Sequence, residues 1–368
     1  MAILKFSINK TELQNALSIV QKGVSTRSTL PVLSGILLDV QADKVVLQST
    51  DLELSIQYSV DALIEEEGKT VVPGKLFTDI IKNLPDAAIH IQSGEGEVKI
   101  TCDNSSFSVH TLNYEDFPGF PNVQTSQSLS IQFNQFASMV KKVSKVVSRD
   151  ESRAILTGVL ITFDEGKLRM VATDSYRLAL TELDMEDTIA DDFQCVIAGN
   201  FLNEIAGLSS SDEMVTIALA ENQIVVNYQN VVFINRRIEG NYPNYKQLIP
   251  DEYNTRATID LSELVSSVKR ASLLSSSTAP MKFDLNIASQ TIQITVTSPD
   301  IGSVQETIVC EIKGEDTEIA FNSAYVIDGL TAVKGDKVYL EVQSALKPGI
   351  FRALTPENFL YLIMPVRI

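Results

Sequence analysis

The sequence is poor in the residues that most disulfide-rich proteins and metalloproteins depend on. It has only three cysteines, Cys102, Cys195 and Cys310, and they are far apart, so neither a disulfide framework nor a cysteine metal site is predicted. We expect each to be buried as a small apolar residue. The two histidines, His90 and His110, fall at predicted strands, where solvent-facing imidazoles are ordinary. The sequence therefore predicts no metal site and no cofactor.

Long apolar runs are also missing. No uninterrupted apolar stretch approaches the roughly 20 residues that a membrane helix needs. The apolar stretch before Lys5 is too short for the core of a secretory signal. We expect a cytoplasmic protein without a membrane partner.

Catalytic motifs are equally scarce. A P-loop is absent because no glycine stands at the required spacing before any Gly-Lys pair, and HExxH and GxSxG do not occur. Asp51, Asp174 and Asp300 recur at equivalent places in the chain, which favours a structural role, since an active site is rarely needed three times. We expect no enzyme, with an unrecognised carboxylate site as the remaining alternative.

Basic residues are also fewer than acidic ones. Lys and Arg number 30 against 47 Asp and Glu, for a net charge of −17. Taken alone, this argues against tight binding to phosphates, because most nucleic-acid-binding proteins carry a basic excess. A function on DNA requires the cations to gather on one surface, or DNA to be held without high affinity.

What the sequence does contain is a repeat. Leu33 and Gly35 recur as Leu156 and Gly158 at one constant spacing. Later in each copy an apolar residue precedes a proline, at 117–118, 242–243 and 364–365, although the third copy is fainter. The spacing is far longer than that of solenoid repeats, so each copy is a domain. We predict three domains, at residues 1–124, 125–252 and 253–368.

Each copy reads as strand, helix and three strands, twice over. Leu52, Leu54 and Ile56 alternate with polar residues, which predicts a strand, and Asn9 or Thr11 can cap the first helix. Two helices cannot cover both faces of about eight strands, so we predict an α+β fold with two helices on one side of antiparallel sheets in each domain. The predicted helices span residues 10–22, 74–84, 134–149, 199–209, 261–275 and 322–334.

The predicted helices are more basic than the rest of the chain. Segment 134–149 is the richest, with Lys141, Lys142, Lys145 and Arg149 and no acidic residue. An ordinary amphipathic helix with solvated lysines would look the same. The contrast between the six helices and the remaining acidic chain favours a cationic helical surface instead. Such a surface suits a closed ring around duplex DNA, where topology prevents escape and weak, sequence-independent contacts permit sliding.

Several longer motifs carry a family resemblance. They are RSTLPVLSGILL at 27–38, VATDSYRLAL at 171–180, EGNYPNYKQLIP at 239–250 and LIMPVRI at 362–368. With the threefold repeat, they make the whole chain resemble the β subunit of bacterial DNA polymerase III, the sliding clamp family. The resemblance implies a head-to-tail homodimer that closes a ring around double-stranded DNA and tethers the polymerase and other replication or repair proteins. It also implies loading by ATP-driven clamp-loader subunits, since this chain has no nucleotide motif.

The resemblance places a hydrophobic groove for short clamp-binding motifs between the second and third domains. Core and edge-strand packing would account for some of the same residues, and Tyr176 and Gln247 depart from residues common in the family, which leaves the preferred motif open. The groove residues it implies are Leu156, Thr173, Arg177, Leu178, Pro243, Leu248, Leu362, Met364, Pro365, Val366 and Arg367.

For DNA, the resemblance implies Arg27 and Arg153, and the helix argument adds Lys141, Lys142, Lys145 and Arg149. For the dimer, it implies that Phe107 and Val109 of one copy meet Leu273 and Leu274 of the next, although packing within one chain would explain the same apolar residues. The alternative to the whole interpretation is a repeat-built, non-enzymatic interaction scaffold without DNA.

Overall fold

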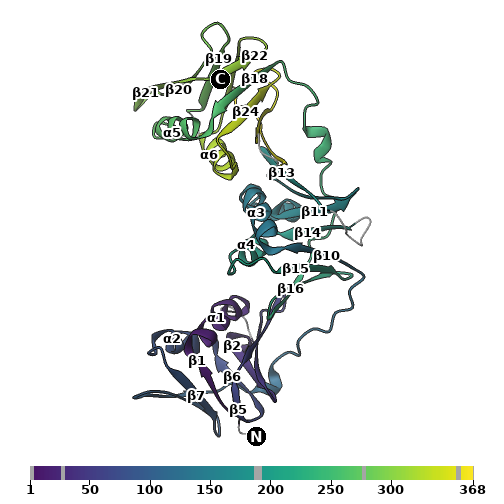
Figure 1. Ribbon diagram of the computed structural model, residues 1–368, viewed down its shortest axis with the longest axis vertical. Helices are drawn as coiled ribbons and strands as arrows, with labels where there is room; N and C mark the ends of the chain where they lie inside the picture. Colours follow the sequence, from purple (N-terminus) through teal and green to yellow (C-terminus); the bar gives the residue numbers. More distant parts are fainter. Residues whose placement is uncertain (1–3, 26–29, 186–192, 276–278, 354–357, 368) are drawn as a thin grey trace. The chain divides into compact units, whose positions relative to one another are not determined.

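The computed structural model describes residues 4–25, 30–185, 193–275, 279–353 and 358–367. The chain forms two compact units, each described here by itself (Figure 1). Unit 1 contains residues 1–131 and 213–236, and unit 2 contains residues 132–212 and 237–368. Arg27, one of the predicted DNA-binding residues, lies outside the described residues.

Unit 1 holds a five-stranded sheet in the order β5-β1-β7-β8-β9 and an eight-stranded sheet in the order β10-β15-β16-β17-β4-β3-β2-β6. The second sheet joins strands of the first repeat to strands of the second through the antiparallel pair β4–β17. The strands are β1 (Lys5–Asn9), β2 (Gly35–Val40), β3 (Lys44–Thr50), β4 (Leu54–Asp61), β5 (Leu63–Glu66), β6 (Gly68–Pro73), β7 (Ala88–Ser93), β8 (Glu97–Cys102), β9 (Ser105–His110), β10 (Gln127–Gln132), β15 (Met214–Leu219), β16 (Gln223–Tyr228) and β17 (Val231–Arg236).

Unit 2 holds a nine-stranded sheet in the order β14-β11-β12-β13-β26-β25-β24-β18-β22 and a four-stranded sheet in the order β21-β20-β19-β23. The nine-stranded sheet joins the second repeat to the third through the antiparallel pair β13–β26. The strands are β11 (Gly158–Asp164), β12 (Lys167–Thr173), β13 (Arg177–Asp184), β14 (Phe193–Ala198), β18 (Thr255–Asp260), β19 (Met281–Asn286), β20 (Thr291–Ser298), β21 (Gly302–Val309), β22 (Glu311–Lys313), β23 (Thr317–Phe321), β24 (Lys337–Val342), β25 (Gly349–Ala353) and β26 (Asn358–Ile363).

The described residues form six α-helices, one near each predicted place. Within unit 1, α1 and α2 pack side by side, and within unit 2 the same holds for α3 with α4 and for α5 with α6 (Figure 1). None of these helices combines the length and the apolarity needed to span a bilayer. Their bounds are α1 (Lys10–Val20), α2 (Gly74–Asn83), α3 (Phe133–Val143), α4 (Gly199–Ala206), α5 (Leu261–Ser272) and α6 (Ser323–Ala332).

The element order repeats three times, which confirms the predicted α+β class. Each repeat runs strand, helix, three strands, then strand, helix, three strands, with β5 and β22 as short additions. Three helices begin at a side-chain cap: Asn9 accepts a hydrogen bond from the Thr11 amide, Asp260 from the Glu263 amide and Asn322 from the Ala324 amide. Asn9, and not Thr11, is therefore the cap of α1.

The predicted helix 134–149 is wrong at its carboxyl end. The α-helix stops at Val143, a single 3-10 turn covers Ser144–Val146, and Val147 is extended with ψ 148°. Lys145 therefore lies in the 3-10 turn and Arg149 lies beyond any helix. Val147 misled the pattern because it is apolar at the helical spacing, whereas its side chain packs against Gly199 at the start of α4.

The predicted strand through Leu52 is also wrong at its start. Leu52 has φ 78° and precedes β4, so it belongs to the turn between β3 and β4. The Asp51 carboxylate accepts hydrogen bonds from the Glu53 and Leu54 amides, which closes that turn. Asp174 closes the equivalent turn of the second repeat in the same way. The structural role predicted for these two aspartates is therefore confirmed.

The repeated glycines mark close contacts between strands. A Cβ on Gly35 would lie 2.4 Å from a methyl carbon of Val71, and one on Gly158 would lie 2.5 Å from a methyl carbon of Val196. The same strand pairing in the two repeats thus requires glycine at the equivalent position.

Both histidines are exposed, on β7 and β9, and all three cysteines are buried and unpaired, as predicted. Burial raises the pKa of the Cys195 thiol to about 12 and that of Cys310 to about 11, so both stay protonated at neutral pH.

Candidate functional site

The joint between the second and third repeats brings most of the predicted groove together. In the β13–β26 pair, Leu178 lies opposite Leu362 and Arg177 lies opposite Ile363. Because side chains alternate along a strand, Leu178 and Leu362 share one face of the nine-stranded sheet, and Arg177 lies on the other face. The joint therefore has an apolar face and a polar face.

The apolar face continues under the segment that follows β17. Leu178 is 1% exposed and Leu362 is 2% exposed, so both form floor rather than wall. Leu248 and Met364 are 48% and 42% exposed, so their side chains are open to an apolar partner. The cluster that forms the floor comprises Leu160, Val171, Leu178, Val196, Tyr245, Ile350, Leu360 and Leu362, with Ile155, Leu180, Ile238, Tyr242 and Ile249 packed against it.

The carboxyl-terminal segment beside this face is hydrogen-bonded to both neighbouring repeats. The Met364 amide donates to the Tyr176 carbonyl at 2.8 Å, and the Val366 amide donates to the Ala320 carbonyl at 2.8 Å. The first bond reaches the second repeat and the second bond reaches the third. The main chain therefore fixes the position of residues 364–366, where the sequence predicted groove wall.

Arg177 dominates the polar face. Its guanidinium donates to Asp174 at 2.9 Å, to Asp328 at 2.6 Å and to the Lys145 carbonyl at 3.1 Å. It also donates to the Tyr361 hydroxyl at 3.3 Å. Burial alone would lower the pKa of Arg177, but Tyr361, Asp328 and Asp174 outweigh burial and raise it. The side chain is thus committed to partners within the chain, and it connects β13 to α6 and to the 3-10 turn that follows α3.

Tyr325 and Tyr361 complete this polar cluster. The Arg177 guanidinium lies 4.3 Å from the centre of the Tyr325 ring, a cation–π distance. The Tyr361 hydroxyl donates to the Tyr325 carbonyl at 2.9 Å, and burial raises the pKa of Tyr361, which keeps the phenol protonated. Neither tyrosine was predicted as a site residue. Both are tyrosines where an apolar residue could pack equally well, and their hydroxyl groups are the one hint in the sequence of a polar role.

Two hydroxyl residues shape the turn before Arg177. The buried Thr173 hydroxyl donates to the Arg177 carbonyl at 2.8 Å and accepts from the Ser175 amide at 3.2 Å. Ser175 has φ 81°, a backbone conformation rarely adopted by a residue with a side chain. Arg153 donates to the Ser175 hydroxyl at 2.7 Å. The predicted DNA-binding residue Arg153 is therefore tied to the turn that carries the predicted groove residue Arg177.

A hollow of about 730 Å³ opens beside this turn. Tyr176, whose side chain is 63% exposed, stands at it together with Arg149 and Arg177. Leu156 lies outside its lining, buried in the 3-10 segment Glu151–Thr157 before β11. The hollow offers the rings of Tyr176 and Tyr325 and charges of both signs. The full lining is Lys145, Val147, Ser148, Arg149, Asp150, Asp174, Tyr176, Arg177, Ala324, Tyr325 and Asp328.

The predicted groove residues are therefore not all in one cavity. Leu178 and Leu362 lie on the sheet face opposite Arg177, and Pro243 lines a separate hollow of about 450 Å³ beside Tyr242 and Tyr245. Pro365 is half-buried and Arg367 is exposed.

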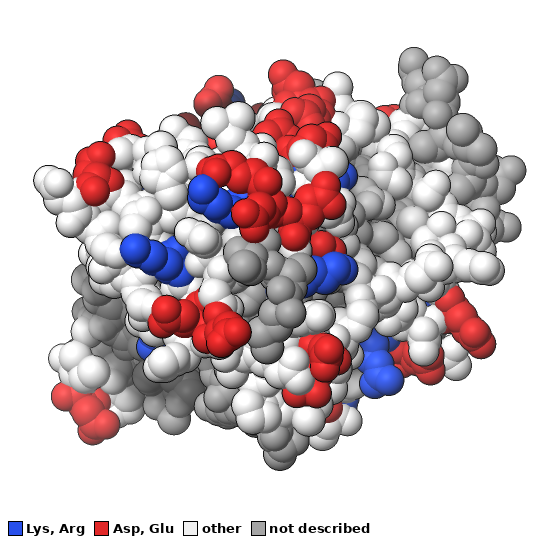
Figure 2. Space-filling model, turned by 90° about the horizontal axis from the view of Figure 1, so that it is seen from below, with Lys and Arg blue, Asp and Glu red and all other residues white. Residues whose placement is uncertain are grey.

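The cations predicted to meet DNA differ in exposure. Lys141, Lys145 and Arg149 are exposed, whereas Lys142 is only 5% exposed. By contrast, acidic side chains form several clusters on the face drawn in Figure 2, where basic side chains stand mostly alone.

Two strands, β9 and β21, lie at the edges of their sheets. The strand β9 ends the five-stranded sheet and β21 ends the four-stranded sheet, so one side of each strand has no partner strand within the described chain. Phe107 on β9 is 41% exposed, whereas Val109 is 5% exposed and packs within the chain. Leu273, just after α5, is 83% exposed, and Leu274 is half-buried.

Near β21, sequence reasoning missed two apolar side chains and an ion pair. Val309 and Ile301 are 74% and 69% exposed. Arg270 of α5 donates to both carboxylate oxygens of Glu306 on β21, at 2.9 and 2.6 Å. This bidentate pair holds the end of α5 against the edge strand.

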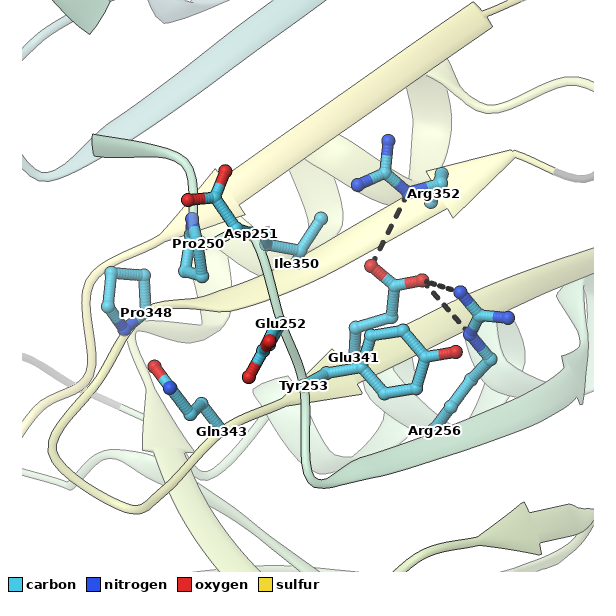
Figure 3. Close-up of a pocket in the computed structure, with 10 residues that line it drawn as sticks. All are labelled: Pro250, Asp251, Glu252, Tyr253, Arg256, Glu341, Gln343, Pro348, Ile350 and Arg352. Atoms are coloured by element: carbon cyan, nitrogen blue, oxygen red, sulfur yellow. Dashed lines mark hydrogen bonds and ion pairs between the residues drawn. The ribbon is translucent and has the colours of Figure 1, made fainter. Parts of the chain in front are cut away.

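A second ion cluster lies in the third repeat (Figure 3). Glu341, 4% exposed, accepts two hydrogen bonds from Arg256, at 3.0 and 2.6 Å, and one from Arg352 at 3.4 Å. The Arg256 guanidinium also lies 4.1 Å from the centre of the Tyr253 ring. The charges of Arg256, Glu341 and Arg352 are paired with one another beside a hollow of about 190 Å³, which indicates a structural role for this cluster. Among the described residues, no group of His, Cys, Asp or Glu is arranged to hold a metal ion.

Comparisons with known proteins cover the chain from end to end. Models of the DNA polymerase III beta subunit match its N-terminal domain at residues 4–121, its central domain at 130–244 and its C-terminal domain at 246–367. A beta sliding clamp of Staphylococcus epidermidis is 31% identical over 99% of this chain and 100% of its own length.

Solved structures agree. The DNA polymerase sliding clamp of Bacillus subtilis matches with a TM-score of 0.94 at 30% identity and covers 99% of both chains. The sliding clamp of Pseudomonas aeruginosa, solved bound to griselimycin, matches with a TM-score of 0.94 at 27% identity over 99% of this chain and 100% of its own. The chain belongs to the DNA polymerase III beta subunit family, the beta sliding clamps.

Proposed function

We propose that two copies of the chain close head to tail into a ring that encloses duplex DNA and tethers a polymerase. The observation that carries this proposal is the pairing rule at the two joints. In each joint, the last strand of one repeat pairs with the third strand after the first helix of the preceding repeat: β17 with β4 and β26 with β13. The remaining strands of these two kinds are β9 and β21, which are both sheet edges.

Extending the rule to a second copy pairs β9 of one subunit with β21 of the other. This contact is heterologous, because it joins different surfaces, and a heterologous contact forms a ring when its rotation closes. Strand addition supplies main-chain hydrogen bonds to two edges that would otherwise invite aggregation. Phe107 and Leu273 are exposed enough to add apolar burial to the interface, whereas Val109 would support β9 from within its own subunit.

The interior surface of the ring would be lined by the α-helices. Lys141, Lys145 and Arg149 would then contact phosphates without regard to sequence. Arg153, which is also exposed but donates to the Ser175 hydroxyl, and the buried Lys142 would contribute to the same potential. Arg27 remains a proposed DNA contact from the family resemblance. Each contact is weak and salt-dependent, which favours sliding, and the ring prevents escape.

The exposed apolar residues at the joint of the second and third repeats would bind short motifs of partner proteins. Leu248 and Met364 supply adaptable apolar contacts, and the floor beneath them is already packed. The partners would be the DNA polymerase, clamp-loader subunits and other replication or repair proteins. The chain itself is a processivity subunit without a catalytic centre, working in the cytoplasm.

Retention on circular DNA tests the proposal. Protein loaded on a nicked circle by a clamp loader should remain bound in high salt and should dissociate once a restriction enzyme linearises the circle. Native mass spectrometry should show a dimer at micromolar concentration. Equal release from circular and linear DNA, or a monomer at that concentration, would refute the ring and favour a scaffold without DNA.

A further inference from the structure

The strand β14 lies at one end of the nine-stranded sheet, and a hollow of about 450 Å³ opens beside it. From the sheet, the hollow is lined by Leu160 and Thr162 of β11 and by Gln194 of β14. The segment after β17 adds Tyr242 and Tyr245. The hollow therefore has a sheet edge on one side and two tyrosines on the other.

This hollow shares its floor with the proposed groove. Leu160 and Tyr245 belong to the same buried cluster as Leu178 and Leu362. Pro243, which the family resemblance places in the groove, is exposed and lines the hollow itself. A peptide that leaves the groove beside Pro243 therefore meets the hollow next.

The main chain of β14 is open at this point. The Val196 carbonyl accepts a hydrogen bond from the Ile238 amide at 3.0 Å, so the main-chain polar groups of Val196 point away from β11. Bonding directions alternate along an antiparallel pair, so the amide and carbonyl of Gln194, two residues earlier, also point away from β11. Within the described part of the chain, no strand pairs with β14 on that side. Gln194 thus offers a donor and an acceptor to an added strand.

The charges of the lining favour an acidic partner. Its one carboxylate, that of Asp164, forms an ion pair with Arg169. Its one basic side chain, Lys246, is exposed and takes part in no ion pair among the described residues. The charge that remains available is therefore positive, in a chain whose net charge is −17.

We propose that the hollow binds an extended segment of a partner protein, directly beside the motif that occupies the groove. The segment adds a short strand to β14 through the main chain of Gln194. It places an apolar side chain against Leu160 and Tyr245 and directs a carboxylate to Lys246. The inference rests on the proposed function and deepens it, because it gives the chemistry of the partner beyond its short motif.

Peptides of two lengths test the proposal. The short probe is a fluorescein-labelled peptide that carries one clamp-binding motif. Two long probes add, at one end or the other, about six residues of alternating apolar and acidic type, roughly 20 Å when extended. Fluorescence anisotropy should show that one long probe binds about tenfold more tightly than the short probe, a gain of about 1.4 kcal/mol. A Gly-Ser extension of the same length is the matched control and should add no affinity.

Two substitutions locate the added affinity. Gln194→Pro removes the outward amide, a change that an edge strand tolerates, and should weaken the long probe about fivefold. Lys246→Glu reverses the available charge and should weaken it about threefold. Lys313→Glu, at an exposed position outside the lining, is the control and should change neither probe. All three variants should bind the short probe as the natural protein does, which also shows that they fold.

Three results would overturn the proposal, and they are distinguishable. Equal affinity of the short probe and both long probes would refute the hollow as a binding site and leave the groove intact. Equal weakening of short and long probes by Gln194→Pro and Lys246→Glu would place the effect in the groove. If the short probe itself fails to bind the natural protein, the proposed groove is refuted, and the extension falls with it.

Discussion

In unit 1, β17 pairs with β4, and in unit 2, β26 pairs with β13, so the two joints share their main-chain design. Their side chains differ. Leu54 begins β4 where Arg177 begins β13, and Phe233 faces Ile56 where Tyr361 faces Ala179. Main-chain pairing and apolar packing are thus sufficient to connect two repeats. The charged cluster at the second joint must serve something else, and we infer that it positions the partner groove.

The largest expected difference between the two joints concerns the carboxyl-terminal segment, which forms hydrogen bonds only at the second joint. Deleting residues 364–368 should abolish binding of a fluorescent clamp-binding peptide and leave the dimer intact, because the deletion removes groove wall and no proposed subunit contact. Fluorescence anisotropy and sedimentation measure the two outcomes. Met364→Ala keeps the main-chain hydrogen bonds, so its effect measures the contribution of the Met364 side chain to peptide affinity. Unchanged peptide affinity after the deletion would show that this segment is not groove wall.

The next effect compares the equivalent residues of the two joints. Arg177→Ala leaves Asp174 and Asp328 without their cation and should lower the free energy of unfolding by about 3 kcal/mol. Leu54→Ala, at the equivalent position of β4, should cost only about 1 kcal/mol, as for an ordinary partly buried side chain. Chemical denaturation of both variants checks the difference. Similar losses would mean that the two joints are energetically alike.

The proposed joint between subunits should be easier to break than either joint within the chain. Leu273→Asp places a charge on a side chain that is 83% exposed in the single chain and should raise the dimer dissociation constant about tenfold or more, a change of about 1.4 kcal/mol. Leu346→Asp is the matched control, since Leu346 is 72% exposed and lies outside β9, β21 and α5. Equal sedimentation behaviour of the two variants would place the dimer contact elsewhere.

The smallest effect is a pH dependence of folding stability from the ion pair between α5 and β21. Hydrogen bonds from Arg270 lower the pKa of Glu306 from its usual 4.5. A carboxylate with a lowered pKa stabilises the folded form above the unfolded value, and this contribution is lost as the pH falls through the folded value. The free energy of unfolding should therefore decrease modestly below about pH 4.5, which denaturant titrations at several pH values would measure. Glu306→Gln should lack this part of the pH dependence, and an identical profile for both proteins would exclude the ion pair as its source.

The sequence predicted the fold well because the repeats reinforce one another. A constant spacing of Leu33, Gly35, Leu156 and Gly158 reports packing that must recur whenever the same strands pair. Two element boundaries were predicted wrongly because the backbone departs locally from the side-chain pattern. The alternation at Leu52 does not reveal a left-handed residue, and the apolar Val147 continues a helical pattern after the helix has ended.

The site was less predictable, since its contacts join residues that are far apart in the sequence. Arg177 and Asp328 are 151 positions apart, and no spacing rule connects them. The family resemblance implied Arg177 as a groove residue, but only coordinates show that its guanidinium lies on the opposite sheet face from Leu178 and Leu362.

The two hydrogen bonds that fix Met364 and Val366 have a practical consequence for anyone who purifies this protein. An affinity tag or fluorescent protein fused after Arg367 would leave directly from the proposed groove. It would compete with incoming peptides or hinder them, and weak partners would be scored as absent. Probes are better attached at the exposed loop around Lys347, which lies outside both proposed interfaces.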